Sequence, residues 1–389
     1  MTTTYQTEWL EKARALEPLV RELRDEGERD RELPKPVWQA MRKAGLFSMW
    51  VPQALGGAEV ELETMVRVVE ELARQDGSVG WNMMIAGNTS VLWSLLSQEA
   101  AASIIKDDPN TVLAGTILGG HGEATPVDGG YRVTGHWPFA SGCHQADWIV
   151  ASCHQVDESG NPRLTSDGQP AVYAFVVPVS DCDILDTWYT TGLRGTGSHD
   201  FEINDVFVPE DRFFLSVGGQ SHQPGPLYNT MITNVWGYNV SAVALGIARD
   251  ALDSFAELAQ TKTSSRNPVP LASRELTQAR LGEAEAKLRS ARAYLYEACR
   301  ENWALLGAGQ PVPLEVAANN RLAYANATER AVEAVEIVYT LAGSAAVYTK
   351  NRIERCFRDV HMVTQHGVVG PAGYTLAGRC FLGVATNLR

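Results

Sequence analysis

The sequence predicts an α+β protein in which a helical N-terminal domain, a central antiparallel β-domain and a C-terminal helical bundle follow one another. Two observations predict this order. Residues 1–110 and 219–389 repeat apolar side chains every three or four positions, which is typical of amphipathic helices. Residues 111–218 instead contain short β-branched and aromatic runs separated by Gly, Pro, Asn and Asp. We therefore expect three domains with these boundaries, the middle one a β-barrel or β-sandwich.

Composition limits the classes of function. Of the 389 residues, 45% are hydrophobic and 20% are charged, as in ordinary globular proteins. The net charge of -13 argues against binding to nucleic acid, and no apolar run reaches the ~18–20 residues of a membrane span. The six cysteines include no CxxC pair, which favours reduced thiols over disulfides or a zinc site. We expect a cytoplasmic protein with no metal site, no nucleic-acid partner and no contact with membranes.

The N-terminal domain reads as four helices. Apolar residues recur at helical spacing over 10–23 and 62–73, and Pro36 opens a short helix between these segments. The fourth helix, residues 81–96, is apolar on all sides, so it is buried or lines a pocket. Asn88-Thr89-Ser90 interrupts it with polar groups, which either bond back to the helix or form a polar notch in a cavity.

A hairpin over residues 128–150 stands at the centre of the β-domain. Its first strand carries aromatic and β-branched residues, and it ends at Phe139 followed by Ala140, Ser141 and Gly142. Such a corner can present a flat ring and a hydroxyl side by side, which suits a planar heterocycle. An ordinary hairpin with a buried aromatic side chain explains the same pattern.

Further along, Trp188 supplies a second aromatic face, and residues 195–198 read Gly-Thr-Gly-Ser. Glycine-rich turns with hydroxyls hold anions in some proteins and are simple turns in many others. The chain then returns to helical patterns over residues 238–259, 276–306 and 313–347 and in a last helical region, which predicts an up-and-down four-helix bundle.

The order α, β, α resembles the acyl-CoA dehydrogenase fold. Three motifs, YRVTGHWPFASGC at 131–143, GLRGTGSHD at 192–200 and RCFRDVHMVTQHG at 355–367, resemble the two-component (group D) flavin-dependent monooxygenases of that superfamily. The resemblance covers nearly the whole chain. It implies an oxygenase component that receives FADH2 or FMNH2 from an NAD(P)H:flavin reductase, and it implies a homotetramer.

In this branch reduced flavin reacts with O2, and the resulting C4a-hydroperoxyflavin hydroxylates a small aromatic or heteroaromatic substrate, here indole-like or phenol-like. The resemblance implies that the hydroxyl of Ser141 lies near flavin N5 and that Phe139 packs against the isoalloxazine ring. It places Trp188 against another part of the ring. It places Ser198 at the ribityl or phosphate end, aided by Arg266 of a neighbouring subunit.

The resemblance also assigns a catalytic role, with Ser141, to His366. Its imidazole either hydrogen-bonds the hydroperoxide or takes a proton from the substrate, and it also contacts the flavin. Trp81, Asn88 and Thr116 are expected to face the substrate. Phenol hydroxylases of the group carry a histidine near the position of Asn88, so its absence here favours an electron-rich substrate such as an indole.

Two other functions remain open from the residues. An acyl-CoA dehydrogenase or oxidase with tightly bound FAD would use a catalytic carboxylate, but the matching position is Gly367, and the Tyr-Glu-Gly context is missing. A non-enzymatic scaffold of the same fold would not need Ser141 and His366, which this chain retains.

Overall fold

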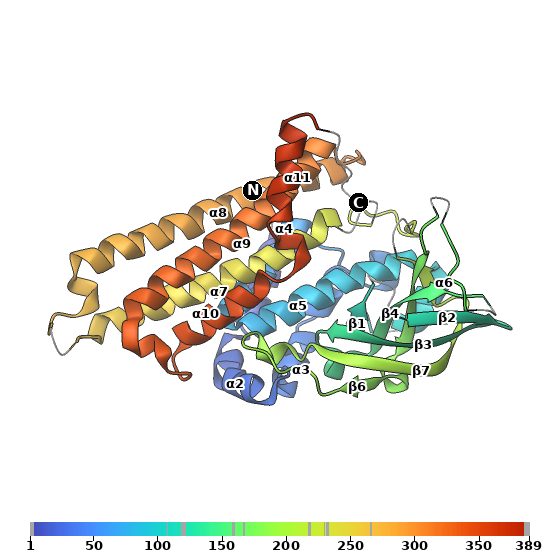
Figure 1. The fold of residues 1–389 in the computed structure, drawn as a ribbon, viewed down its shortest axis with the longest axis horizontal. Helices are drawn as coiled ribbons and strands as arrows, with labels where there is room; N and C mark the ends of the chain where they lie inside the picture. The colour runs from blue at the N-terminus through green and yellow to red at the C-terminus, as the bar shows by residue number, and fades with distance from the viewer. Residues whose placement is uncertain are drawn as a thin grey trace.

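The computed structural model describes residues 4–106, 108–117, 122–157, 160–165, 168–216, 219–228, 230, 233–264 and 267–384. A layer of N-terminal helices and a long helical bundle enclose one side of a twisted sheet (Figure 1). The predicted α+β fold class is confirmed. The exact domain boundaries stay a prediction, although the first helices end at Ile105 and the strands run from Leu113 to Leu215. The predicted flavin contact Arg266 lies outside the described residues.

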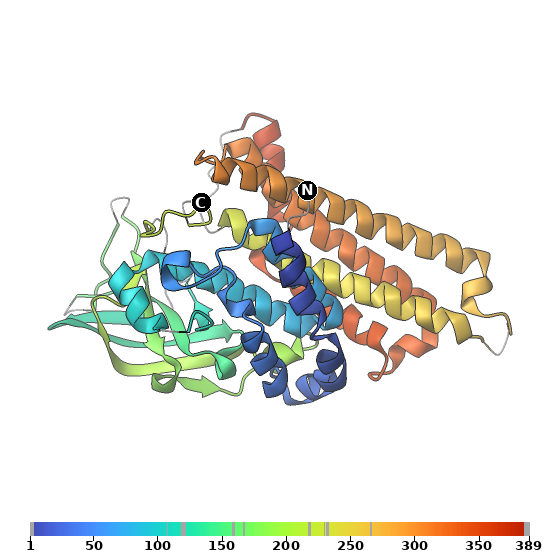
Figure 2. The same ribbon diagram turned by 180° about the vertical axis from the view of Figure 1, so that it is seen from behind.

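The N-terminal helices pack behind the sheet and against the bundle (Figure 2). The fourth predicted helix begins at Gly77, where Asp76 caps its N-terminus by accepting a hydrogen bond from the Ser78 amide at 2.9 Å. It runs between the bundle and the sheet and touches both (Figure 1). The helices are α1 (Thr4–Arg14), α2 (Glu17–Asp30), α3 (Lys35–Lys43), α4 (Leu62–Gln75), α5 (Gly77–Ser90) and α6 (Gln98–Ile105).

The strands form one mixed sheet with the order β6-β7-β3-β2-β4-β5-β8, and β1 pairs with β4. The sequence predicted an antiparallel sheet, but β4 runs parallel to β1 and β2. The reason is that the chain reverses twice between β2 and β4, and β4 returns on the other side of β2 from β3. The strands are β1 (Leu113–Thr116), β2 (Gly122–Val127), β3 (Gly130–Ala140), β4 (Trp148–Gln155), β5 (Val172–Pro178), β6 (Asp183–Leu185), β7 (His199–Pro209) and β8 (Phe213–Leu215).

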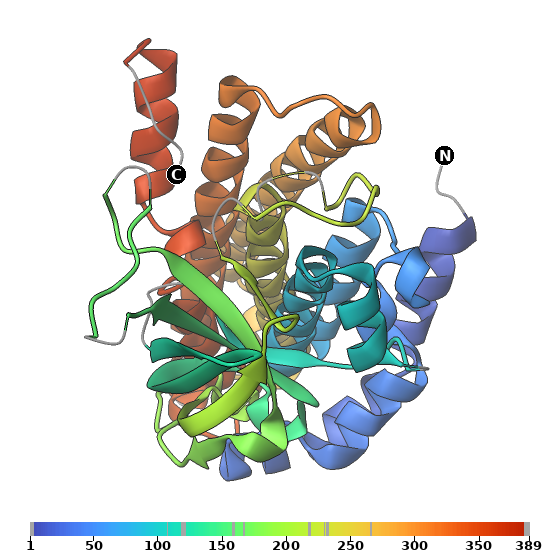
Figure 3. The same ribbon diagram turned by 90° about the vertical axis from the view of Figure 1, so that its right-hand side faces the viewer.

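The bundle consists of three long helices and a fourth that is broken. Seen from the sheet side, the long helices run away from the viewer behind the strands (Figure 3), and the last helix packs against the third of them. The break falls at η9 (Gly367–Val369), a short 3-10 turn directly after His366. No helix in the described part of the chain is long and apolar enough to cross a membrane. The helices are α7 (Thr233–Thr261), α8 (Glu275–Gly307), α9 (Leu314–Ala342), α10 (Arg352–Val363) and α11 (Ala372–Phe381).

Candidate functional site

A buried hydrogen-bonded cluster lies where the end of β3 meets α5 and the segment before β7. The indole Nε1 of Trp81 donates to the hydroxyl oxygen of Ser141 at 3.0 Å, and the hydroxyl oxygens of Ser141 and Ser198 are 2.6 Å apart. Both serines are buried. Three residues that the sequence predicted as site residues are therefore in direct contact, although they come from distant parts of the chain.

The backbone around Ser141 is strained. Phe139 has a φ of +66°, which is strained for an aromatic residue, whereas Gly142 adopts its φ of +73° without strain because it has no β-carbon. The Phe139 ring is 68% exposed, and it meets Trp188 edge to face with ring centroids 6.3 Å apart. Strained positions and exposed aromatic rings of this kind cluster at binding sites. Phe139 and Trp188 thus form an open aromatic corner beside the hydroxyl of Ser141.

Residues 188–198, here called the glycine loop, hold the other side of the cluster. The carbonyl of Leu193 accepts hydrogen bonds from the indole Nε1 of Trp188 at 3.1 Å and from the hydroxyl of Thr196 at 2.8 Å. The Thr196 hydroxyl is 2.7 Å from that of Ser198. The backbone of one residue, Leu193, therefore positions both the aromatic corner and the hydroxyl cluster.

The Leu193 peptide is itself fixed by Asp359 of α10. Leu193 has a φ of +50°, and its amide donates to the Asp359 carboxylate at 2.6 Å. The second carboxylate oxygen points at the start of α5, where a β-carbon on Gly77 would be only 3.2 Å away. The sequence predicted no role for Asp359, and it placed Thr196 only within the glycine-rich turn at residues 195–198. No local pattern signals the contact of Asp359, because Leu193 and Asp359 are 166 residues apart in the chain.

His366 lies beside Trp81, with the two ring centroids 5.9 Å apart and the rings edge to face. Its Nδ1 accepts a hydrogen bond from the Val368 amide at 3.3 Å and so caps η9. Burial lowers the pKa of His366, so the ring is neutral at pH 7. Because Nδ1 accepts, the ring proton is on Nε2, and this atom is left free to donate.

Two further predicted substrate residues, Asn88 and Thr116, come from α5 and β1. Asn88 is buried about 10 Å along α5 from Trp81. Its carboxamide accepts from Asn239 of α7 at 2.8 Å and donates to the sulfur of Met84. Thr116 ends β1, opposite Ala151 of β4. The structure therefore places Asn88 at a helix–helix contact, and its predicted contact with substrate stays a prediction.

Asp359 also makes the stability of the fold depend on pH. Burial, together with the nearby charge of Asp76, raises the pKa of Asp359 from 3.8 to about 7, although Arg352 opposes the shift. Between these values the folded protein holds a proton that the unfolded chain releases. The free energy of unfolding therefore falls as the pH rises from about 4 to 7, by at most about 1.4 kcal/mol per pH unit from this group. Above pH 7 the contribution of this group levels off.

We expect Asp359→Asn to flatten this part of the pH profile, because an amide does not titrate. Urea denaturation at half-unit steps from pH 4.5 to 8 measures the slope, and Asp76→Asn serves as a comparison from the same group of charges. A slope that is unchanged in Asp359→Asn contradicts the assignment of the buried proton to this residue.

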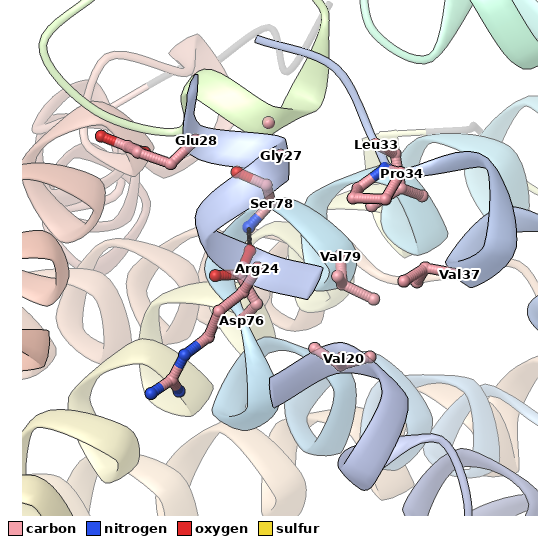
Figure 4. A pocket seen from close by; sticks show the side chains of 11 residues that line it. Val20, Arg24, Gly27, Glu28, Leu33, Pro34, Val37, Asp76, Ser78 and Val79 are labelled. Carbon is pink, nitrogen blue, oxygen red and sulfur yellow. Dashed lines mark hydrogen bonds between the residues drawn. The ribbon is translucent and has the colours of Figure 1, made fainter. Parts of the chain in front are cut away.

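A small cavity lies next to the glycine loop, between α2, α3 and the start of α5 (Figure 4). Its volume is about 10 Å³, which is the size of one water molecule. Arg24, Asp76 and Ser78 line it, and Gly195 of the glycine loop closes one side. The cavity is too small for an aromatic substrate.

The residues present fit a flavin. The exposed ring of Phe139 and the neighbouring Trp188 offer apolar surface to a flat tricycle, and Ser141 offers a hydroxyl beside them. Among the described residues, no group of three or more His, Cys, Asp or Glu side chains could hold a metal ion. When bound, a reduced flavin supplies the electrons that activate dioxygen, and the protein supplies orientation and exclusion of water.

Comparison with known families agrees with the fold. The family described as "Acyl-CoA dehydrogenase, N-terminal domain" matches residues 7–101, and "Acyl-CoA dehydrogenase, C-terminal domain" matches residues 238–371. Indole-3-acetate monooxygenase of Pseudomonas putida is 34% identical over 95% of this chain and 93% of its own length. The flavin-dependent monooxygenase oxygenase subunit HsaA of Mycobacterium tuberculosis is 28% identical over 95% of both chains.

Two solved structures extend the likeness to three dimensions. XiaF from Streptomyces sp., in complex with FADH2 and glycerol, has a TM-score of 0.92 and 25% identity, and the match covers 99% of this chain and 97% of XiaF. The 3-HSA hydroxylase from Rhodococcus sp. RHA1 has a TM-score of 0.87 and 27% identity over 98% of both chains. This chain belongs to the acyl-CoA dehydrogenase family, and within it to the flavin-dependent monooxygenases that use reduced flavin and dioxygen.

Proposed function

We propose that this chain is the oxygenase component that hydroxylates a small indole-like or phenol-like substrate with reduced flavin from a separate NAD(P)H:flavin reductase. The names of relatives that act on indole-3-acetate and p-hydroxyphenylacetate support this substrate class. The observation that carries the proposal is the buried cluster in which Trp81 and Ser198 hold the hydroxyl of Ser141, with His366 beside Trp81.

In this proposal the flavin ring rests against Phe139 and Trp188 with its N5 edge at Ser141. Ser198 acts by holding Ser141, because its hydroxyl is already bonded to Ser141 and Thr196. This contact favours a structural role for Ser198 over the predicted one at the ribityl chain or phosphate. Arg266 keeps its predicted role at the flavin as a proposal.

His366 acts as a hydrogen-bond donor in this site. Its Nδ1 is occupied by the Val368 amide, so the neutral ring presents an N–H group and no free lone pair. This arrangement favours donation to the oxygen atoms held beside the flavin over removal of a proton from the substrate. It suits a substrate that needs no deprotonation, such as an indole.

The dehydrogenase alternative lacks its base at the expected position. Gly367 is exposed and has no side chain, and a β-carbon there would meet nothing within 4 Å. One oxygen of the Asp359 carboxylate accepts the Leu193 amide, and the side chain is buried away from solvent. These two observations favour the monooxygenase reaction over abstraction of a proton from a thioester.

The chain is proposed to form a homotetramer in the cytoplasm. All six cysteines are free, which agrees with a reducing compartment. Phe381 and Leu382 at the end of the projecting α11 are 66% and 81% exposed, and Tyr348 is also exposed (Figure 1). Exposed apolar side chains of this size favour a contact with another subunit. Residues 1–110, 111–218 and 219–389 are proposed as the domains of each subunit.

Oxygen consumption by the purified protein tests the proposed function. We expect a hydroxylated product only when photoreduced FAD or FMN and an aromatic substrate are both supplied, whereas reduced flavin without substrate consumes dioxygen and yields only hydrogen peroxide. Indole-3-acetate, p-hydroxyphenylacetate and a saturated acyl-CoA thioester are compared in parallel. Oxidation of the thioester in the absence of a reductase, or failure of every aromatic substrate with both reduced flavins, contradicts the proposal.

A further inference from the structure

The hydroxyl groups around Ser141 form a chain whose hydrogen-bond direction is fixed at one end. A carbonyl oxygen can only accept, so the 2.8 Å contact with the Leu193 carbonyl requires the Thr196 hydroxyl to donate. A hydroxyl has one proton, so Thr196 has none left for Ser198. At the 2.7 Å contact between these two hydroxyls, Ser198 is therefore the donor.

The same counting extends to Ser141. The proton of Ser198 points to Thr196, so Ser141 must donate across the 2.6 Å contact between the two serines. Ser141 also accepts the indole N–H of Trp81 at 3.0 Å. Its proton and one of its two lone pairs are thus used. One lone pair remains, so Ser141 can act toward any further partner only as a hydrogen-bond acceptor.

Water does not reverse this direction. Thr196, Ser198 and Ser141 are only 1%, 3% and 6% exposed. The Leu193 residue, at which the chain of hydroxyl groups begins, is held in place as well. Its amide donates to Asp359, and its carbonyl also accepts from Trp188. Reversing the three hydroxyls would break the bond from Thr196 to the Leu193 carbonyl, which would keep its bond from Trp188, so the reversal would lose one buried hydrogen bond.

The two redox states of flavin differ at the atom expected beside Ser141. N5 carries a hydrogen in reduced flavin and donates, whereas N5 of oxidised flavin has only a lone pair and accepts. We propose that Thr196 and Ser198 fix Ser141 as an acceptor, so that the site binds reduced flavin in preference to oxidised flavin. This inference rests on the proposed placement of flavin N5 at Ser141. It makes Thr196 and Ser198 positioning residues that select the redox state of the cofactor.

Dissociation constants test the inference without any turnover. Oxidised FAD and FMN, and the same flavins reduced anaerobically, are titrated into wild type, Thr196→Val, Ser198→Ala and Ser141→Ala. Thr196→Val keeps the shape of Thr196 but removes its hydroxyl. Ser198 can then donate its hydrogen bond to Ser141 instead, and Ser141 is free to donate its own proton to the flavin. We expect the ratio of oxidised to reduced dissociation constants to fall by about 5- to 10-fold, which corresponds to one hydrogen bond.

Ser198→Ala should lower this ratio to a similar extent, whereas the control Thr196→Ser, which keeps the hydroxyl, should preserve it. Thermal melting confirms that each variant is folded. The inference is overturned if the ratio of oxidised to reduced dissociation constants is unchanged in both Thr196→Val and Ser198→Ala while Ser141→Ala still weakens the binding of reduced flavin. If Ser141→Ala leaves both redox states bound as tightly as wild type does, the placement of the flavin in the proposed function is wrong instead.

Discussion

Replacement of His366 by alanine is expected to lower the rate of product formation by about 100-fold while dioxygen is still consumed, because one positioned donor is lost. The oxygen that is not inserted should appear as hydrogen peroxide. Product and peroxide are quantified together in single-turnover reactions with reduced flavin. The product formed per dioxygen consumed separates a loss of chemistry from a loss of flavin binding.

His366 also caps η9, so a matched variant must keep that contact. Asn is a good N-cap residue, and His366→Asn retains an acceptor for the Val368 amide but lacks Nε2–H. If the imidazole acts in the reaction, His366→Asn loses product formation as fully as His366→Ala. Recovery of wild-type coupling in His366→Asn means that the histidine is only a cap.

The pH dependence of the wild type gives a second check on His366. Burial places its pKa below the ordinary value of 6.5, so the neutral form should persist through pH 7 and 8. The product formed per dioxygen consumed should therefore not change above about pH 6.5 through titration of His366. It should change only under more acidic conditions, and His366→Asn should lack that change.

Ser141→Ala is expected to have the second large effect, because the hydroxyl serves two sets of partners. Its removal takes away the partner of the partly buried indole N–H of Trp81, and the loss of this hydrogen bond should cost about 0.5–1.5 kcal/mol of folding stability. It also removes the acceptor for flavin N5–H, so we expect peroxide release to rise by about 5- to 10-fold relative to product. Urea denaturation and peroxide assays measure the two effects separately.

Ser141→Thr is the control for this position, since it keeps the hydroxyl and adds a methyl group. We expect it to retain most of the coupling, with a stability cost from the added volume. Equal peroxide release from Ser141→Ala and wild type would show that the hydroxyl does not act on the reduced flavin. In that case the stability effect alone would remain.

The sequence predicted those parts of the site that local patterns encode. The corner at the end of β3 was visible in Phe139, Ser141 and Gly142, because an aromatic strand that stops at a small hydroxyl residue and a glycine is a local feature. The mixed sheet was not predicted, since strand order depends on contacts between β4 and strands that lie far away in the sequence.

Contacts between distant segments escaped sequence reasoning for the same reason. Asn88 was predicted to contact the substrate or to bond to its own helix. Its amide does donate to Met84 of α5, but its carbonyl also accepts from Asn239, 151 residues away, which no local pattern signals. Of its neighbours, Thr89 and Ser90 do bond back to carbonyls of their own helix. The Asp359 clamp on Leu193 was equally invisible, because an acidic residue on a helix usually faces solvent and only the folded structure reveals its burial.

The position of the reduced flavin is the central claim of this account, and an anaerobic crystal structure with FADH2 or FMNH2 tests it most directly. We expect the ring against Phe139 and Trp188, with N5 at hydrogen-bond distance, about 2.7–3.2 Å, from the hydroxyl of Ser141. His366 should lie on the same side of the ring as the substrate space. A ring bound elsewhere, or an N5 edge turned away from Ser141, would contradict the account.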